Sequence, residues 1–192
     1  MEPRQLLKIS GKSQFFELMS NTIDMDNMYI NFEEYDLKKP KGQRKQGQVQ
    51  IYVPCIKAYV LSKDIFSGKM SVLAKRAQET AKKSGYKYAK EIYTHMGGVS
   101  KTKLAKFGKD RKDGMSLSRQ FKITPGSKLP WILSAESGPG EEDVNGLIVP
   151  RYGNKPEIII RVALTDEQFK QFAGTLELAC MVWMQEKIFR KE

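Results

Sequence analysis

The chain has 192 residues, and its content of 40% hydrophobic and 29% charged residues is typical of a globular protein and excludes a largely disordered one. Its 33 Lys and Arg outnumber 22 Asp and Glu, so the net charge is +11, and a surface of this sign attracts polyanions such as DNA, RNA or acidic membranes. Two cysteines and one histidine are too few for the roughly four ligands of a structural zinc site, and they argue against a disulfide-stapled secreted fold.

No apolar stretch approaches the roughly 20 residues that cross a bilayer, and the first residues lack the apolar core of a signal peptide. We therefore expect a cytoplasmic protein without membrane contact, in a cell or in a phage-infected host. A basic protein with no polyanion partner is the alternative, because net charge bears on association rather than on fold.

In the first half of the chain, apolar residues occur at helical spacing in some segments and alternate with polar ones in others. We predict a helix at 12–23, strands at 28–35, 48–53 and 56–62, and a helix at 64–83. Pro54 separates the second and third strands, and Ser84-Gly85 ends the second helix. Residues 38–48 hold one Pro, two Gly and five Lys or Arg without an acid, which predicts a basic hairpin loop.

The second half is predicted to contain more strands and the clearest helix of the chain. We predict strands at 86–94, 115–124, 130–136, 146–150 and 157–164, a basic flexible loop at 97–114, an acidic turn at 137–146 and a helix at 166–189. Thr165 and Gln168 form the pattern of a capping box, and the acids Asp166 and Glu167 suit the N-terminus of a helix. The middle of this helix has almost no polar face, so we expect it to be central to the core or to form a subunit interface.

These elements predict an α+β fold in which a strongly curved antiparallel β-sheet is backed by two main helices, in a single domain spanning 1–192. The order of strands followed by a helix occurs twice, over 28–84 and 86–189. Leu61-Ser62 with Phe66 and Leu164-Thr165 with Phe169 have the same spacing in the two units. This similarity indicates either a duplicated unit or a coincidence of a few positions.

Patterns typical of catalysis and of metal binding are missing from the sequence. His95 has no Ser or Cys in a recognisable nucleophile pattern, and residues 67–71 lack the glycine and the Ser or Thr of a phosphate loop. The consecutive carboxylates at 141–143 lie in a Gly/Pro-rich turn, where solvation explains them better than a metal ion. We therefore expect no enzymatic activity, no catalytic residue, no cofactor and no metal ligand.

Positive charge is concentrated in two segments of flexible composition, 38–48 and 97–114. Such segments can follow a phosphate backbone and release its counterions, although charged loops also simply keep proteins in solution. Two positively charged loops in a chain with a net charge of +11 favour the binding of a polyanion. We expect phosphate contacts from both loops and from one lysine outside them: Lys38, Lys39, Lys41, Arg44, Lys45, Lys57, Lys101, Lys103, Lys106, Lys109, Arg111 and Lys112.

Three tyrosines fall on the polar faces of predicted strands. Side chains alternate across a strand, so Tyr29, Tyr52 and Tyr59 oppose the apolar positions of their strands and lie among amides and a lysine. Unpaired bases stack on such rings with about 1–3 kcal/mol per base and little dependence on sequence. The alternative is that these tyrosines favour strands and pack on their neighbours.

The pattern Val162-x-Leu164-Thr165-x-Glu167-Gln168-Phe169 resembles the end of the transcriptional coactivator fold called positive cofactor four. The repeated order of strands and helix resembles its larger relatives, the Whirly proteins and related phage proteins. The close similarity covers only 157–175, and neither the basic segment 97–114 nor the helix expected at 12–23 has a counterpart. The resemblance implies a curved antiparallel sheet that cradles single-stranded DNA and helices that mediate oligomerisation, but it assigns no individual contact residue.

We therefore expect a sequence-tolerant single-stranded DNA-binding protein of replication, recombination or DNA transfer, for example in a phage or mobile element, that forms a homo-oligomer through helix 166–189. The basic side chains of helix 64–83 leave a duplex-DNA regulator open as an alternative, and an RNA-binding protein is another. A scaffold protein with an incidental basic surface and a nuclease are the remaining alternatives.

Overall fold

Residues 4–189 are described by the computed structural model, and they form two antiparallel sheets with helices beside them, so the predicted α+β class is confirmed. Sheet A is built by the first part of the chain, and each of its strands pairs with the next. Its elements are β1 (Gln5–Ser10), β2 (Gln14–Met19), the 3₁₀ helix η1 (Ile23–Met25), β3 (Asn27–Tyr35) and β4 (Lys45–Pro54).

Sheet B is built by the second part of the chain, and its far end is strongly curved. Its strands are β5 (Tyr93–Val99), β6 (Ser116–Pro125), β7 (Trp131–Glu142), β8 (Ile148–Pro150) and β9 (Ile158–Leu164). β8 and β9 pair with successive parts of the same long strand, β7. β8 lies back over β5, where a Cβ added to Gly98 would be 3.0 Å from the Cβ of Ile148. The predicted strong curvature is therefore confirmed.

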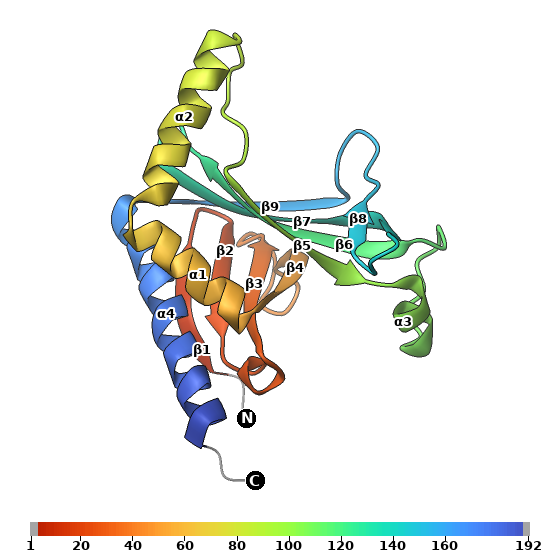
Figure 1. Cartoon of the computed structure of the whole chain (residues 1–192). Helices are drawn as coiled ribbons and strands as arrows, with labels where there is room; N and C mark the ends of the chain where they lie inside the picture. The colour runs from red at the N-terminus through yellow and green to blue at the C-terminus, as the bar shows by residue number, and fades with distance from the viewer. Residues whose placement is uncertain (1–3, 190–192) are drawn as a thin grey trace.

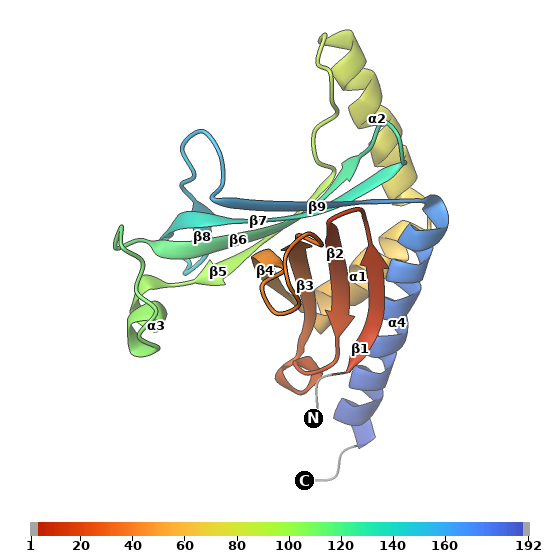
Figure 2. The same ribbon diagram turned by 180° about the vertical axis from the view of Figure 1, so that it is seen from behind.

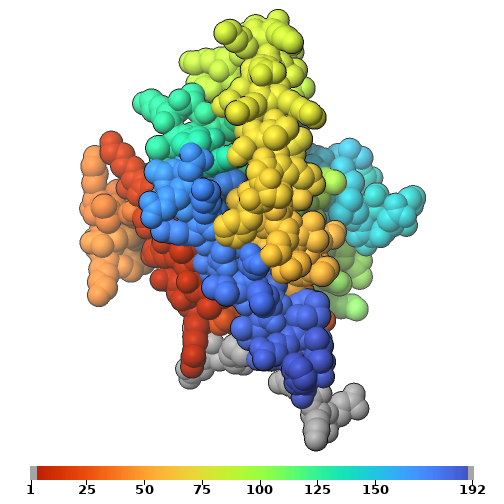
Figure 3. All heavy atoms as spheres, turned by 60° about the vertical axis from the view of Figure 1, so that its left-hand side comes forward, coloured from red at the N-terminus to blue at the C-terminus, as the bar shows by residue number. Residues whose placement is uncertain are grey.

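The helices lie on different sides of the two sheets (Figure 1). α1 (Cys55–Phe66) and α4 (Asp166–Phe189) pack on each other beside sheet A, and Figure 3 shows them side by side on one face of the molecule. α2 (Lys69–Lys83) projects beyond sheet B on the side away from sheet A. The short α3 (Lys101–Lys106) lies in the connection between β5 and β6.

Four phenylalanine rings join the two sheets to α4. Phe16 of β2, Phe32 of β3, Phe121 of β6 and Phe172 of α4 are fully buried, and their neighbouring ring centroids are 5.5 to 6.2 Å apart. Burial of a side chain of this size contributes about 1.5–3 kcal/mol. Sheet A therefore turns its apolar face toward sheet B and the helices. Its polar face lies on the opposite side, nearer the viewer in Figure 2.

The N-terminus of α4 has the capping box predicted from the sequence. The amide of Thr165 donates to Oε1 of Gln168 at 3.0 Å, and the amide of Gln168 donates to Oγ1 of Thr165 at 3.2 Å. Trp131 Nε1 also donates to Oδ1 of Asp166 at 2.7 Å, which anchors the first turn to sheet B. No helix within residues 4–189 has both the length and the apolarity needed to span a bilayer.

The second half of α4 differs from a core helix, because it exposes large apolar side chains. The first half buries Phe169, Phe172 and Leu176, as a central helix would. From residue 178 onwards the exposed apolar side chains are Leu178, Met181, Val182, Met184, Ile188 and Phe189. The helix is thus central to the core over only part of its length.

The helix predicted at 12–23 is wrong, because this segment forms β2 and η1. Phe16 and Leu18 point into the core two residues apart, as strand positions do. Phe15 is also buried, on the other face, where its ring lies 5.9 Å from that of Tyr35. A strand with apolar residues on both faces lacks the alternation that would distinguish it from a helix.

The strand predicted at 56–62 is also wrong, because these residues lie in α1. Its buried side chains recur at three- and four-residue spacing: Ala58, Leu61, Ser62 and Ile65. Pro54 is the N-cap of this helix rather than a break between two strands. Leu61-Ser62 therefore lie within a helix, whereas Leu164-Thr165 lie at a strand–helix boundary, and the matched motifs are not structurally equivalent.

Other boundaries also differ from those expected. β4 begins at Lys45, so the basic loop expected at 38–48 is shorter. The helix predicted at 64–83 is interrupted by Gly68, whose φ of +80° breaks it into α1 and α2. The strand predicted at 86–94 is an irregular connection until β5 begins at Tyr93. The loop expected at 97–114 includes the end of β5 and α3. The acidic turn expected at 137–146 is shorter, because β7 continues to Glu142.

Candidate nucleic-acid interface

Tyr29 and Tyr52 lie side by side on the polar face of sheet A. They are direct partners in the register of β3 and β4, and their rings stack with centroids 5.1 Å apart and 13° between planes. Gln50 Nε2 donates to the Tyr29 hydroxyl at 2.9 Å. Tyr29 is only 9% exposed, whereas Tyr52 is 42% exposed. One ring of this pair is therefore open to a planar ligand, and the other supports it.

Arg119 lies next to this ring pair. It is on the face of β6 that points toward sheet A, two residues before the buried Phe121. Burial lowers the pKa of its guanidinium, and the nearby Tyr52 and Tyr29 partly offset this effect. An arginine nevertheless remains a cation at pH 7. Within residues 4–189, no carboxylate forms an ion pair with Arg119. A guanidinium of this kind can donate two parallel hydrogen bonds to a phosphate or a carboxylate.

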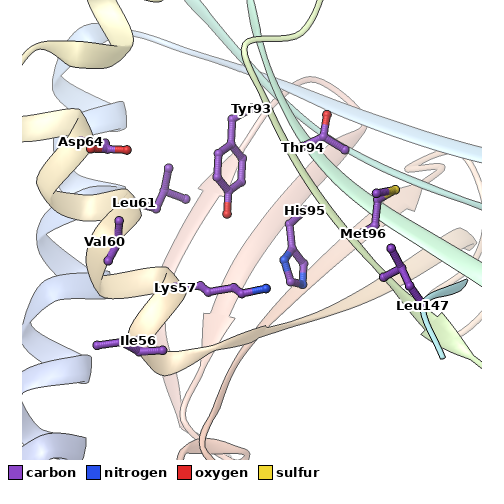
Figure 4. A pocket seen from close by; sticks show the side chains of 10 residues that line it. All are labelled: Ile56, Lys57, Val60, Leu61, Asp64, Tyr93, Thr94, His95, Met96 and Leu147. Atoms are coloured by element: carbon purple, nitrogen blue, oxygen red, sulfur yellow. The ribbon is translucent and has the colours of Figure 1, made fainter. Parts of the chain in front are cut away.

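A groove separates α1 from β5, and we call it the α1–β5 groove (Figure 4). It consists of two adjoining hollows of about 340 and 500 Å³, which share Lys57, His95 and Met96 in their linings. The smaller hollow contains Tyr52 and Arg119. The larger one continues between α1 and the start of β5 and is lined there by Tyr93 and Val60. Tyr52 therefore lines one end of the depression that the two adjoining hollows form.

His95 connects the two walls of this groove. Its Nε2 lies 3.0 Å from the carbonyl oxygen of Tyr52, and because a carbonyl can only accept, Nε2 carries the proton. Burial lowers the pKa of His95, the hydrogen bond to Tyr52 raises it, and the positive charge of Lys57 lowers it. The net change is a pKa below the ordinary value of 6.5, so the ring is neutral at pH 7. Asp64, which also lines the groove, is paired with Lys69 at 2.7 Å. Lys57 and Arg119 therefore supply the positive charge.

Hydrogen bonds hold the rest of the polar face of sheet A in a fixed arrangement. Gln48 Nε2 donates to Oδ1 of Asn31 at 2.6 Å, and Asn31 Nδ2 donates to Oε1 of Glu17 at 2.9 Å. This row crosses β4, β3 and β2 beside the tyrosine pair. A surface that is already ordered loses less conformational entropy when it binds a ligand.

The two basic loops predicted from the sequence flank the same part of sheet B. A Cβ on Gly47, which lies at the end of the first predicted loop and in β4, would be 3.6 Å from Cγ2 of Ile158. Arg111, in the second loop, pairs with Glu157 at 2.7 Å and with Asp113 at 2.6 Å. Its side chain is 14% exposed and already binds two carboxylates. Arg111 is therefore unsuited to the phosphate contact expected of it.

The other side chains that were predicted to contact phosphate are exposed to solvent. They are Lys38, Lys39, Lys41, Arg44, Lys45, Lys57, Lys101, Lys103, Lys106, Lys109 and Lys112. Three of them have partners, since Lys39 Nζ donates to Oε1 of Gln46 at 2.9 Å, Arg44 Nε donates to the carbonyl of Lys39 at 3.1 Å, and Lys45 lies 3.6 Å from Glu33. Those at 101, 103 and 106 are presented by α3 rather than by a flexible loop.

Tyr59 does not share a surface with the other two predicted stacking rings. It lies in α1, where the ammonium of Lys63 is 5.2 Å from its ring centroid. It lines a separate hollow of about 210 Å³ together with Cys180 and Met184. The expected row of three rings on one sheet face is therefore reduced to the pair formed by Tyr29 and Tyr52.

The sequence interpretation did not include Arg119 and His95 in the site. The signal for Arg119 was present, since it shares the face of its strand with Phe121 and Ile123, where an arginine is unusual. The sequence interpretation also left out residues 82–90, where lysines and tyrosines lie close together. The side chains of this segment are exposed except for that of Ala89. His95 was considered only as a catalytic base and not as a residue that joins two walls.

The described residues contain no group of three or more His, Cys, Asp or Glu side chains that could hold a metal ion. The two cysteines are buried, and Cys180 Sγ donates to the carbonyl oxygen of Cys55 at 3.1 Å. No protein-family model matches the chain, and no curated protein matches it.

Proposed function

We propose that this protein binds single-stranded DNA with little dependence on sequence and without catalysing a reaction on it. The observation that carries the proposal is the position of Arg119, a half-buried cation without a carboxylate partner among the described residues, beside the stacked pair of Tyr29 and Tyr52. An unpaired base lies flat on the exposed ring of Tyr52. Its phosphate is held by Arg119 and by Lys57 on the facing wall.

The groove favours a single strand over a duplex. In a duplex the bases are already paired and stacked inside, so an isolated tyrosine ring on a sheet gains nothing from them. The net charge of +11 attracts the phosphate backbone of either form. The exposed lysines of α3 and of the β3–β4 hairpin extend the positive surface beyond the groove.

The curved antiparallel sheet is also the structure that the resemblance to positive cofactor four and the Whirly proteins implies. Our proposal is that the chain is related to these proteins. It further places the protein in the cytoplasm, in replication, recombination or DNA transfer of a phage or mobile element. The capped helix that follows β9 supports it, since it is the part of the chain on which the resemblance depends.

We further propose that the exposed apolar side chains of α4 are covered by a second copy of the chain. Leu178 and Val182 are 68% and 53% exposed on the same face of the helix, one turn apart. Leu178→Glu should therefore convert an oligomer to a monomer in sedimentation equilibrium. Lys170→Glu, an exposed charge change earlier on α4, is the control and should leave the mass unchanged. A monomeric wild-type protein would contradict this part of the proposal.

The test of function compares the affinities for oligothymidine, for duplex DNA and for single-stranded RNA by fluorescence anisotropy at one fixed salt concentration. Oligothymidine should bind tightest. Tighter binding of duplex or of RNA would replace the proposal by one of those alternatives, and equally weak binding of all three would favour a scaffold with an incidental basic surface. Labelled DNA should stay intact with Mg²⁺ or Mn²⁺ present, because degradation would indicate a nuclease.

A further inference from the structure

A second cluster of exposed tyrosines and lysines lies at the far end of α2, and we call residues Lys82–Lys90 with the turn 125–128 the α2 tip. Tyr86 and Tyr88 are 65% and 64% exposed. A hollow of about 300 Å³ lies between this segment and the turn that joins β6 to β7. The α2 tip projects beyond sheet B on the side away from sheet A, so it is separate from the polar face of sheet A (Figures 1 and 2).

The backbone at the α2 tip is held in place by the end of the helix. Gly85 has φ of +70°, its amide donates to the carbonyl of Lys82, and the amide of Tyr86 donates to the carbonyl of Ala81 at 2.9 Å. This is the Schellman pattern of helix termination, which fixes the direction in which the chain leaves the helix. Tyr86 is therefore presented at a defined position although its side chain is open to solvent.

The chemistry of the α2 tip suits a polyanion with exposed rings. Residues 82–90 contain four lysines and no acid, and Lys87 Nζ lies 5.3 Å from the ring centroid of Tyr88. Lys82 and Lys87 line the hollow beside the two tyrosines, and Lys128 follows on the facing turn. Two solvent-exposed rings with lysines beside them suit a ligand that offers both bases and phosphates better than a purely apolar partner.

The chain itself connects the α2 tip to the α1–β5 groove. Residues 86–92 descend from the end of α2 to β5, whose first residue, Tyr93, lines the groove (Figures 1 and 4). We propose that the α2 tip is a second contact site for the same single-stranded DNA, in which Tyr86 and Tyr88 stack on bases while Lys82, Lys83 and Lys87 contact phosphates. This inference depends on the proposed function and extends its binding path along residues 86–95.

The experiment uses the full chain and an oligothymidine long enough to reach both sites, about 30 nucleotides given that single modules cover about 4–16. Tyr86→Leu/Tyr88→Leu should weaken binding by about tenfold or more and reduce the number of nucleotides occluded per protein. The control is Phe66→Leu, which removes a half-exposed ring at the end of α1, outside the proposed oligomer face of α4, and should leave both quantities unchanged. Circular dichroism should show that the variants are folded.

Photo-cross-linking with 5-iodouridine in the same oligonucleotide gives a second readout that separates the two proposals. We expect cross-links to Tyr86 or Tyr88 and also to Tyr52. Cross-links only to Tyr52, with the double variant binding as tightly as the wild type, would overturn the second site and leave the proposed function intact. If the wild type does not bind the strand at all, the proposed function itself fails. Tighter binding of an RNA strand at the α2 tip would replace DNA as its ligand.

Discussion

Tyr52 stacks on Tyr29 with a centroid distance of 5.1 Å, and only Tyr52 reaches solvent to a large extent. The two rings therefore have different roles, one as a contact surface and the other as its support. We expect Tyr52→Ala to weaken binding of oligothymidine by about 1–3 kcal/mol with a small effect on stability. Tyr29→Ala should lower the free energy of unfolding by about 2–4 kcal/mol, because it leaves a cavity under Tyr52. Anisotropy titrations and urea denaturation measure the two effects, and equal destabilisation by both would contradict this division.

Arg119→Met tests the phosphate contact. Methionine keeps most of the apolar stem but removes the charge, so we expect weaker binding and a slope of log K against log salt concentration reduced by about 1. The free energy of unfolding should not fall, because a half-buried cation without a carboxylate partner does not stabilise the fold. The matched control is Lys155→Met, an exposed lysine on the connection between β8 and β9, which should change the slope less. A loss of stability without a change in slope would indicate a structural role.

His95 should make stability depend on pH in a narrow window. Burial lowers its pKa in the folded state below the ordinary value of 6.5, so the unfolded chain takes up a proton first as pH falls. Stability should therefore be highest above pH 6.5 and decline as pH falls from 6.5 through the lowered folded pKa. Urea denaturation at pH 7.5 and 5.5 measures the decline, which should be smaller in His95→Gln, whose amide can still donate to Tyr52. An unchanged decline in this variant would assign the effect to other groups.

Two neighbouring glycines of β5 that line the groove should respond very differently to alanine. A Cβ at Gly98 would lie 2.2 Å from the carbonyl oxygen of Leu117. A Cβ at Gly97 would have its nearest atoms 4.0 Å away. Gly98→Ala should therefore lower the free energy of unfolding by more than about 1 kcal/mol, while Gly97→Ala stays within about 0.5 kcal/mol of the wild type. Thermal denaturation of both variants checks this contrast, and similar stabilities would show that β5 and β6 can separate locally.

The sequence predicted the fold class, the strand at β3 and the capped helix α4, because in each case local pattern and final environment agree. It failed at β2, where Phe15 and Phe16 are buried on opposite faces, and at α1, where Tyr59 was assigned to a strand. The short apolar run at 56–62 fits either structure until the packing of α1 on α4 decides. Such contacts between distant segments are not encoded locally.

The candidate site was predictable only in part for the same reason. Tyr29 and Tyr52 were recognisable because they fall on the polar faces of predicted strands, and Lys57 was recognisable because of its charge. Arg119 and His95 enter the site because sheet B crosses sheet A, and this relation between β4, β5 and β6 has no local signature.

The most direct test of base stacking combined with phosphate contacts uses two strands of equal length and charge, oligothymidine and an abasic deoxyribose phosphate chain. Their affinities are measured in dilute buffer for the wild type and for Tyr52→Leu. We predict that the wild type binds oligothymidine more tightly than the abasic chain, and that Tyr52→Leu loses much of this difference while it retains its affinity for the abasic chain. Equal binding of both strands by the wild type, or no binding of either, would contradict the proposed function.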